Sequence, residues 1–271
     1  MLAEGLDHSE GVAWGLDGRL YAGGEAGQVY AITLRGEVEE VANTGGSLLG
    51  IALDGRGRVY ACDAGASKVV RIDPRDGAID TILTGLPGRP LDLPNALAFA
   101  PNGTLYVTDS GSADQSNGRI LRITGGRAQL FSEALPAYPN GCCVAPDGSA
   151  LFVVESTLPG VSRIPIRADG TAGRPELIAR TPVVPDGCAL DAAGALIVSC
   201  YRPDRIYRIL PGGPVDILAD DPRGGTLNAP TNVAFVGSGL KWLAAANVGE
   251  DFISVRKMEI PGAALAYPDV D

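Results

Sequence analysis

Four oxygen-bearing side chains recur at nearly constant spacing and could together bind a hard metal ion. Six positions lie eight residues before a turn glycine and 39 to 46 residues apart, namely Glu10, Leu49, Asn95, Asn140, Asp186 and Thr231. Four of them carry a carboxylate or amide oxygen, whereas Leu49 and Thr231 do not. Two carboxylates and two amide carbonyls form the donor set that Ca²⁺ prefers, with Mg²⁺ and Mn²⁺ as alternatives and Zn²⁺ ranked lower.

A simpler interpretation is that an Asn or Asp beside glycine only forms a turn, as we expect for Asp17, Asn102 and Asp147. The four residues as a set argue against that interpretation, because they share one column of the repeat. A buried pair of carboxylates would also be costly without a cation. The sequence therefore predicts one divalent-cation site formed by Glu10, Asn95, Asn140 and Asp186.

The elements that must position these residues are short β-strands in a repeat of about 45 residues. Each unit contains an apolar strand, an Asp/Asn-Gly turn, a second strand, a third strand of alternating apolar and basic residues, and a shorter fourth strand. Six such units without helical periodicity predict an all-β fold, a six-bladed β-propeller with four-stranded antiparallel blades in one domain, residues 1–271. The innermost strands of a propeller surround one channel, so the four residues would converge at its entrance.

The ring must also close, and the last unit lacks a convincing fourth strand after Ile260. The segment Leu2–Leu6 resembles Leu130–Leu135, which occupies the fourth-strand position of an earlier unit. We therefore expect the N-terminal strand to complete the last blade, which removes an exposed sheet edge.

Charge and composition exclude several classes of partner. The chain carries 22 Lys and Arg against 32 Asp and Glu, a formal charge of −10, and its basic residues are not clustered, so no nucleic-acid partner is expected. No apolar run approaches the roughly 20 residues of a membrane span, and the N-terminus has no signal-peptide pattern, so we expect no membrane association and a cytoplasmic location. Five cysteines without CxxC spacing indicate small core residues rather than disulfides or zinc ligands.

Several segments containing these positions resemble one known family. They are Glu10–Trp14, Leu93–Phe99, Pro139–Gly141, Val184–Gly187 and Pro230–Phe235. Across essentially the whole chain they are similar to the senescence marker protein/gluconolactonase/luciferin-regenerating enzyme family. The resemblance implies a six-bladed propeller with one divalent cation held by a Glu, two Asn and an Asp, here Glu10, Asn95, Asn140 and Asp186. In gluconolactonase-like members the first Asn lies nearer to the substrate, which makes Asn95 a catalytic and substrate-binding candidate as well as a ligand. The same set also resembles diisopropylfluorophosphatase.

The entrance expected from the sequence is less polar than a sugar site requires. Gluconolactonase-type members often place an Arg two residues before the first Asn, where this chain has Leu93. With Leu48, Leu49, Tyr138 and Thr231 also expected near the entrance, a more apolar lactone or ester is favoured over a sugar-acid lactone. Asp63, Asp109 and Glu155 end second strands on the same face and are expected to accept hydrogen bonds from strands or loops. Leu93, Asn95 and Asp109 are the predicted substrate-binding residues.

Together with the predicted cation site, the resemblance implies a metal-dependent lactonase, a carboxylic ester hydrolase acting on a small molecule. The cation would polarise the carbonyl and Asp186 would deprotonate the attacking water, with Asn95 beside the substrate. A phosphotriesterase at the same site and a non-catalytic propeller stabilised by its metal are the alternatives. With ordinary carboxyl pKa values of about 3.9 and 4.3, metal binding is expected to weaken only in mild acid. His8, the single histidine, is expected to be a loop residue near the entrance.

Overall fold

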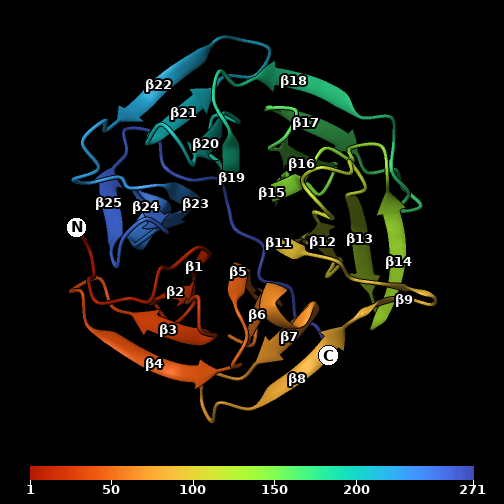
Figure 1. Ribbon diagram of the computed structural model, residues 1–271, viewed down its shortest axis with the longest axis horizontal. Coiled ribbons are helices and arrows are strands. Elements are labelled where there is room, and N and C mark those ends of the chain that lie inside the picture. Colours follow the sequence, from red (N-terminus) through yellow and green to blue (C-terminus); the bar gives the residue numbers. More distant parts are fainter.

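A computed structural model describes residues 1–271 and confirms the six-bladed β-propeller of antiparallel blades (Figure 1). The first three blades are formed in chain order by β1 (Val12–Trp14), β2 (Leu20–Gly23), β3 (Gln28–Ile32), β4 (Val38–Asn43); β5 (Leu48–Leu53), β6 (Val59–Asp63), β7 (Lys68–Ile72), β8 (Ile79–Leu83); and β11 (Pro94–Phe99), β12 (Leu105–Asp109), β13 (Arg119–Thr124), β14 (Arg127–Ser132). The last three are formed by β15 (Pro139–Val144), β16 (Ala150–Glu155), β17 (Gly160–Pro165), β18 (Glu176–Arg180); β19 (Pro185–Leu190), β20 (Leu196–Cys200), β21 (Arg205–Ile209), β22 (Val215–Asp220); and β23 (Pro230–Val236), β24 (Trp242–Asn247), β25 (Ile253–Lys257).

The hydrophobic core is divided among the spaces between adjacent blades. Each of its six clusters joins residues of two neighbouring blades, so each blade is covered on both faces. The second strands show this most clearly, since every residue of β6, β12 and β20 is buried. Outer strands such as β4 are largely exposed. The third strands, which alternate apolar and basic residues, lie between the buried second strands and these exposed outer strands and are partly buried.

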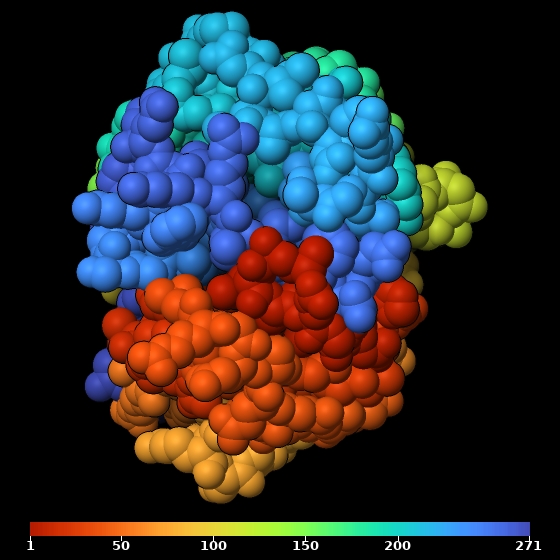
Figure 2. All heavy atoms as spheres, turned by 90° about the vertical axis from the view of Figure 1, so that its left-hand side faces the viewer, coloured from red at the N-terminus to blue at the C-terminus, as the bar shows by residue number.

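The N-terminus completes the last blade, as the sequence predicts. Ala3 forms an antiparallel bridge with Ile253 of β25, where the Leu2 N–H donates to the Ile253 carbonyl over 2.8 Å and the Ile253 N–H donates to the Ala3 carbonyl over 3.0 Å. The pairing is shorter than expected, a single bridge rather than a strand. Ala3 and Leu6 nevertheless pack into the cluster between the first and last blades, and Figure 2 shows the N-terminal residues lying against that blade.

A short hairpin and two 3₁₀ turns were not foreseen. The hairpin of β9 (Gly85–Leu86) and β10 (Arg89–Pro90) lies between the second and third blades. The 3₁₀ turns η1 (Ala64–Ala66) and η2 (Ser238–Leu240) are each three residues long. No helix in the structure has the length and apolar character needed to span a membrane.

The C-terminal tail, defined here as residues 261–271, crosses the channel axis (Figure 1). It hydrogen-bonds in turn to the end of β19, through the Ala263 N–H and the Leu190 carbonyl, and to the end of β1, through the Tyr267 hydroxyl and the Trp14 carbonyl over 2.6 Å. The Gly55 N–H then donates to the Pro268 carbonyl. Because the predicted metal ligands stand at or before the beginnings of the innermost strands, the tail covers the opposite end. A cavity of about 180 Å³ lies there, and 25 of its 29 lining residues are hydrophobic.

Candidate metal centre

Each predicted ligand in the third, fourth and fifth blades stands on a β-bulge at the start of the innermost strand. In β11 the pairing with β12 shifts between Pro94 and Leu97, and β15 and β19 show the same shift after Pro139 and Pro185. Two residues of the inner strand therefore oppose one residue of the second strand, and the first of the two is Asn95, Asn140 or Asp186. A bulge of this kind changes the direction of a side chain near a functional site. The same shift occurs in β5 and β23, where Leu49 and Thr231 stand, so the bulge belongs to the repeat and the residue type at this position distinguishes the predicted ligands.

Glycines beside the predicted ligands allow neighbouring inner strands to approach closely. A Cβ added at Gly11 would lie 1.8 Å from the Leu49 carbonyl oxygen, and one at Gly141 would lie 2.5 Å from the Asp186 carbonyl oxygen. Neither position has room for a side chain, because backbone atoms cannot move away as a flexible side chain could. The sequence shows these glycines only as part of a repeated motif, and their role in packing the channel wall follows from the structure.

All four predicted ligands line one cavity of about 510 Å³ at the channel entrance. The other lining residues are Ser47, Leu49, Ala64, Gly65, Leu93, Tyr138, Ser156, Val184 and Tyr201. Leu48 and Thr231, which we expected at the entrance, are not among them, because both are about 1 % exposed. Thr231 instead donates from Oγ1 to the Glu10 backbone carbonyl over 2.9 Å and so fixes the first predicted ligand to the last blade.

Two oxygen atoms in this cavity are buried without a hydrogen-bond partner, Oδ1 of Asn140 and Oδ1 of Asp186. The Asn140 amide is oriented by its nitrogen, because Nδ2 donates to Ser156 Oγ over 3.2 Å. Ser156 Oγ donates in turn to the Pro185 carbonyl over 2.7 Å. A buried polar atom without a partner is costly, and a cation coordinated by both oxygens would remove that cost. The donor set and these two atoms fit a hard divalent cation.

The carboxyl groups of the cavity have strongly altered acidities. Burial, with a smaller contribution from the negative charge of Glu25, raises the pKa of Glu10 to about 7. Burial and the charge of Glu10 raise the pKa of Asp186 well above its usual range, while the neighbouring Asn140 amide opposes the rise. Burial and the charges of both carboxylates also raise the pKa of the Tyr138 phenol. Without a cation, this environment favours neutral carboxyl groups.

Comparison with known proteins identifies the family. Residues 8–245 match the model of the SMP-30/gluconolactonase/LRE-like region. The chain belongs to this family. It is 25 % identical over 179 residues to the gluconolactonase of Zymomonas mobilis, a match that covers 58 % of this chain and 49 % of the relative. The chain thus spans about half the length of the curated relatives that it matches.

Two solved structures share the fold over nearly the whole chain. A gluconolactonase from Xanthomonas campestris is 21 % identical, covers 97 % of this chain and 88 % of its own, and superposes with a TM-score of 0.81. Regucalcin from Agrobacterium tumefaciens, described as a calcium-binding protein, is 17 % identical, covers 100 % of this chain and 95 % of its own, and has a TM-score of 0.80. At these identities the similarity establishes the fold alone.

Within this family member, Asp109 does not lie on the cavity wall. It is 1 % exposed, and its Oδ1 accepts from the backbone N–H groups of Asp92 and Leu93 over 3.1 and 2.8 Å. Its Oδ2 lies 2.8 Å from an Arg119 guanidinium nitrogen. Because both oxygens are occupied by protein donors, direct substrate contact is not the role that the geometry supports. Asp109 instead positions the segment that carries Leu93 and Asn95.

The same hydrogen-bonding role repeats at the ends of other second strands, as the sequence analysis expected. Asp63 Oδ1 accepts from the Ser47 N–H over 3.2 Å, and Glu155 Oε1 accepts from the Ala137 N–H over 3.1 Å. Each bond ties the loop before an innermost strand to the second strand of the same blade.

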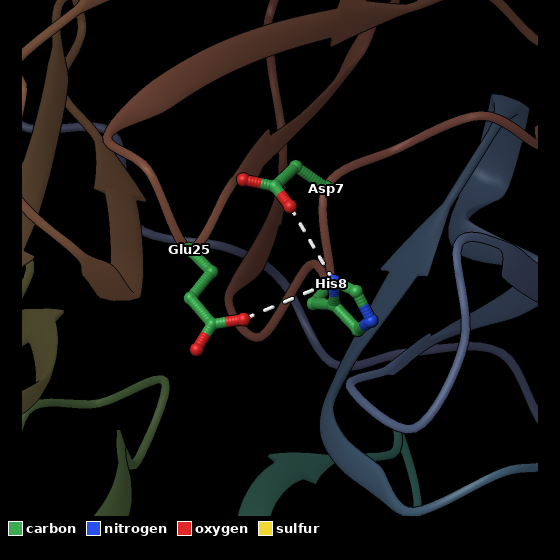
Figure 3. Close-up of side chains that lie close together, drawn as sticks. All are labelled: Asp7, His8 and Glu25. Atoms are coloured by element: carbon green, nitrogen blue, oxygen red, sulfur yellow. Dashed lines mark hydrogen bonds and ion pairs between the residues drawn. The ribbon is translucent and has the colours of Figure 1, made fainter.

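His8 belongs to a cluster with Asp7 and Glu25 outside the cavity (Figure 3). His8 Nδ1 lies 3.4 Å from Asp7 Oδ1 and 3.8 Å from Glu25 Oε2. The sequence did not reveal this cluster, because Glu25 comes from the turn between β2 and β3. His8 and Glu25 are exposed, and Asp7 Oδ2 already accepts from the Ala26 N–H and from Gln28 Nε2, so the cluster stabilises the N-terminal segment.

Proposed function

We propose that this protein is a divalent-metal-dependent lactonase with Ca²⁺ as the preferred ion. The observation that carries the proposal is the pair of buried oxygens without partners, Asn140 Oδ1 and Asp186 Oδ1, in a cavity that also contains Glu10 and Asn95. Family membership and the names of the relatives, gluconolactonase and calcium-binding regucalcin, support it. Glu10, Asn95, Asn140 and Asp186 are the proposed ligands.

The chemistry proposed is addition of water to a lactone carbonyl. Glu10, Asn95, Asn140 and Asp186 would hold the cation, which would supply polarisation of the carbonyl oxygen and compensation of the negative charge that develops there. The Asp186 carboxylate accepts a proton from the attacking water, and the proton later passes to the leaving ring oxygen, so that the product is a hydroxy acid. The Asn95 amide, which lies beside Leu93 on the wall, orients the substrate. Tyr138 lies on the same wall, and its phenol, protonated at neutral pH, can donate a hydrogen bond to the substrate.

The cavity lining favours an uncharged and partly apolar substrate. It contains no Lys, Arg or His, so apart from the proposed cation no group on the wall would bind a carboxylate or phosphate of the substrate. Leu49, Leu93 and Val184 lie on its wall, and Val184 is 42 % exposed. Apolar surface of this kind binds alkyl or aryl groups better than hydroxyl groups. We therefore infer a γ- or δ-lactone, or an ester, that carries an apolar substituent.

A substrate panel with controlled metal content tests the proposal. The chelated protein and the protein reloaded with Ca²⁺, Mg²⁺, Mn²⁺ or Zn²⁺ would be assayed at neutral pH against alkyl-substituted lactones, sugar-acid lactones, aryl esters and organophosphates. We expect metal-dependent turnover of the alkyl-substituted lactones. Turnover of organophosphates alone would replace the proposal with a phosphotriesterase. No turnover, together with a large metal-dependent rise in the melting temperature, would indicate a non-catalytic propeller.

A further inference from the structure

Two cysteines meet between the innermost strands of the fourth and fifth blades. The sulfur atoms of Cys143 in β15 and Cys188 in β19 lie 3.6 Å apart, although 45 positions separate them in the chain. Neither is among the proposed ligands or the residues of the entrance cavity. Both line the apolar cavity on the tail side of the channel.

The backbones of these two strands are in close contact, as at the other boundaries between innermost strands. A Cβ added at Gly141 would lie 2.5 Å from the Asp186 carbonyl oxygen and 3.0 Å from the Cys188 nitrogen, so Gly141 faces the fifth blade at contact distance. Side chains two residues apart on a strand point to the same face, so Cys143 also faces the fifth blade. Cys142 points the other way and packs with Ala96 and Tyr106 of the third blade.

Accessibility distinguishes the two thiols. Cys143 is half-buried, whereas Cys188 is 6 % exposed. A small oxidant that enters the apolar cavity would therefore meet Cys143 first. Cys188 is then the nearest thiol, already within the distance of a thiol–thiol hydrogen bond.

We propose that Cys143 and Cys188 form a peroxide-reactive dithiol site that closes reversibly into a disulfide between two blades. Hydrogen peroxide oxidises the Cys143 thiol to a sulfenic acid and is reduced to water. The Cys188 sulfur then attacks the sulfenic sulfur, forming the S–S bond and releasing a second water. The sulfur atoms must approach from 3.6 Å to about 2.0 Å, so the two side chains rotate toward each other as the bond forms. A thiol reductant restores both thiols.

The cross-link would join the strands that carry two proposed ligands, two residues after Asp186 and three after Asn140. It closes a loop of 45 residues in the unfolded chain, and long loops restrict the unfolded ensemble most. We expect the oxidised protein to melt about 5 °C higher than the reduced protein. The inference is independent of the proposed lactonase activity.

The test is peroxide treatment of the native, Ca²⁺-supplemented chain, followed by denaturing thiol titration and non-reducing peptide mapping. We expect two of the five thiols to be lost, a peptide pair linked through Cys143 and Cys188, and recovery of all five with dithiothreitol. Retention of all thiols, a disulfide that uses another cysteine, or oxidation of Cys143 to a sulfinic acid without a cross-link would overturn the proposal. These outcomes require no variant to fold.

Variants sharpen the assignment. Cys143→Ala and Cys188→Ala should each abolish the cross-link and the rise in melting temperature. Cys142→Ala is the matched control, because it removes the adjacent thiol on the opposite face of the same strand and should leave the cross-link intact. Loss of the cross-link in Cys142→Ala would show that the cross-link also depends on Cys142, on the opposite face of the strand, and would contradict the assignment to Cys143.

Discussion

The two ends of the central channel are built by the same six blades but have opposite chemistry. At the entrance, side chains on the bulged starts of three inner strands, with Glu10 from the first blade, direct carboxylate and amide oxygens into one cavity. A few residues further along the same strands, the lining is almost entirely apolar and the C-terminal tail crosses it. Residues only two positions apart on one inner strand therefore line the polar end and the hydrophobic end of the channel.

This difference explains the electrostatics of the entrance. The apolar lining begins directly after the proposed ligands on the same strands, so water can solvate the carboxylates only from the entrance side. Burial then becomes the largest influence on both Glu10 and Asp186 and raises the pKa of each. The ordinary values of about 3.9 and 4.3, on which the sequence-based expectation of metal loss in mild acid rested, do not apply at this site.

The largest effect is expected from a change confined to the entrance. Asp186→Asn keeps an oxygen of the same size but removes the proposed base, so the rate of lactone hydrolysis should fall by about 10²- to 10⁴-fold at saturating metal. Asn140→Ala should act mainly on metal affinity, and added Ca²⁺ should recover part of its rate. Rates measured against Ca²⁺ concentration separate the two roles. Near-complete rescue of Asp186→Asn by metal would show that Asp186 is a ligand only.

The tail should matter for stability and not for chemistry. Deletion of residues 262–271 removes the packing of Tyr267 and the hydrogen bond to Trp14, and should lower the free energy of unfolding by about 3 kcal/mol. Ca²⁺ affinity, measured by titration calorimetry, should change by less than about twofold at a temperature where both forms are folded. Leu265→Ala is the control, because this side chain is 42 % exposed and its loss should be nearly neutral. A large loss of Ca²⁺ affinity on deletion would mean that the two ends are coupled.

A smaller effect is expected from the residue that orients a ligand. Ser156→Ala removes the acceptor of the Asn140 amide, so Asn140 Oδ1 is no longer directed into the cavity and Ca²⁺ affinity should weaken about 10-fold. Ser110→Ala is a matched control, because Ser110 Oγ also donates to the carbonyl before a ligand, that of Pro139, but contacts no ligand amide. Calorimetric titration of both variants makes the comparison. Equal losses of Ca²⁺ affinity in the two variants would show that the hydrogen bonds from the serines to backbone carbonyls cause the effect, and not the contact with the Asn140 amide.

The smallest effect is a pH dependence of the metal-induced change in melting temperature. Raised carboxyl pKa values stabilise the metal-free fold below about pH 4.5, and this contribution is lost as pH rises through about 7. Ca²⁺ needs the charged carboxylates, so its binding should strengthen over the same range. The rise in melting temperature on adding Ca²⁺ should therefore grow by a few degrees between pH 5 and pH 8, as calorimetric scans can measure. A constant rise across this range would contradict the burial of these carboxyl groups.

Much of the architecture could be predicted because its signals are local. A turn glycine, alternating apolar residues and a repeat of about 45 residues depend only on neighbours in the chain, and they were sufficient for six blades. The closing role of Leu2–Leu6 was also predictable from its likeness to another fourth strand. The column of Glu10, Asn95, Asn140 and Asp186 followed from the same repeat, because equivalent residues of a ring must converge.

The remaining features depend on contacts between residues far apart in sequence, and only the tertiary structure decided them. Asp109 carries a carboxylate that could have faced substrate, but Arg119 and the backbone before β11 occupy both its oxygens. The direction of the Asn140 amide depends on Ser156, and the proximity of Cys143 to Cys188 depends on strands that touch across a blade boundary. By itself, the sequence determined which residues form the repeat and where each strand turns. Burial of the side chains at the entrance arises only when the blades pack around the channel, and it sets the pKa values of the carboxyl groups and the hydrogen-bond partners within reach.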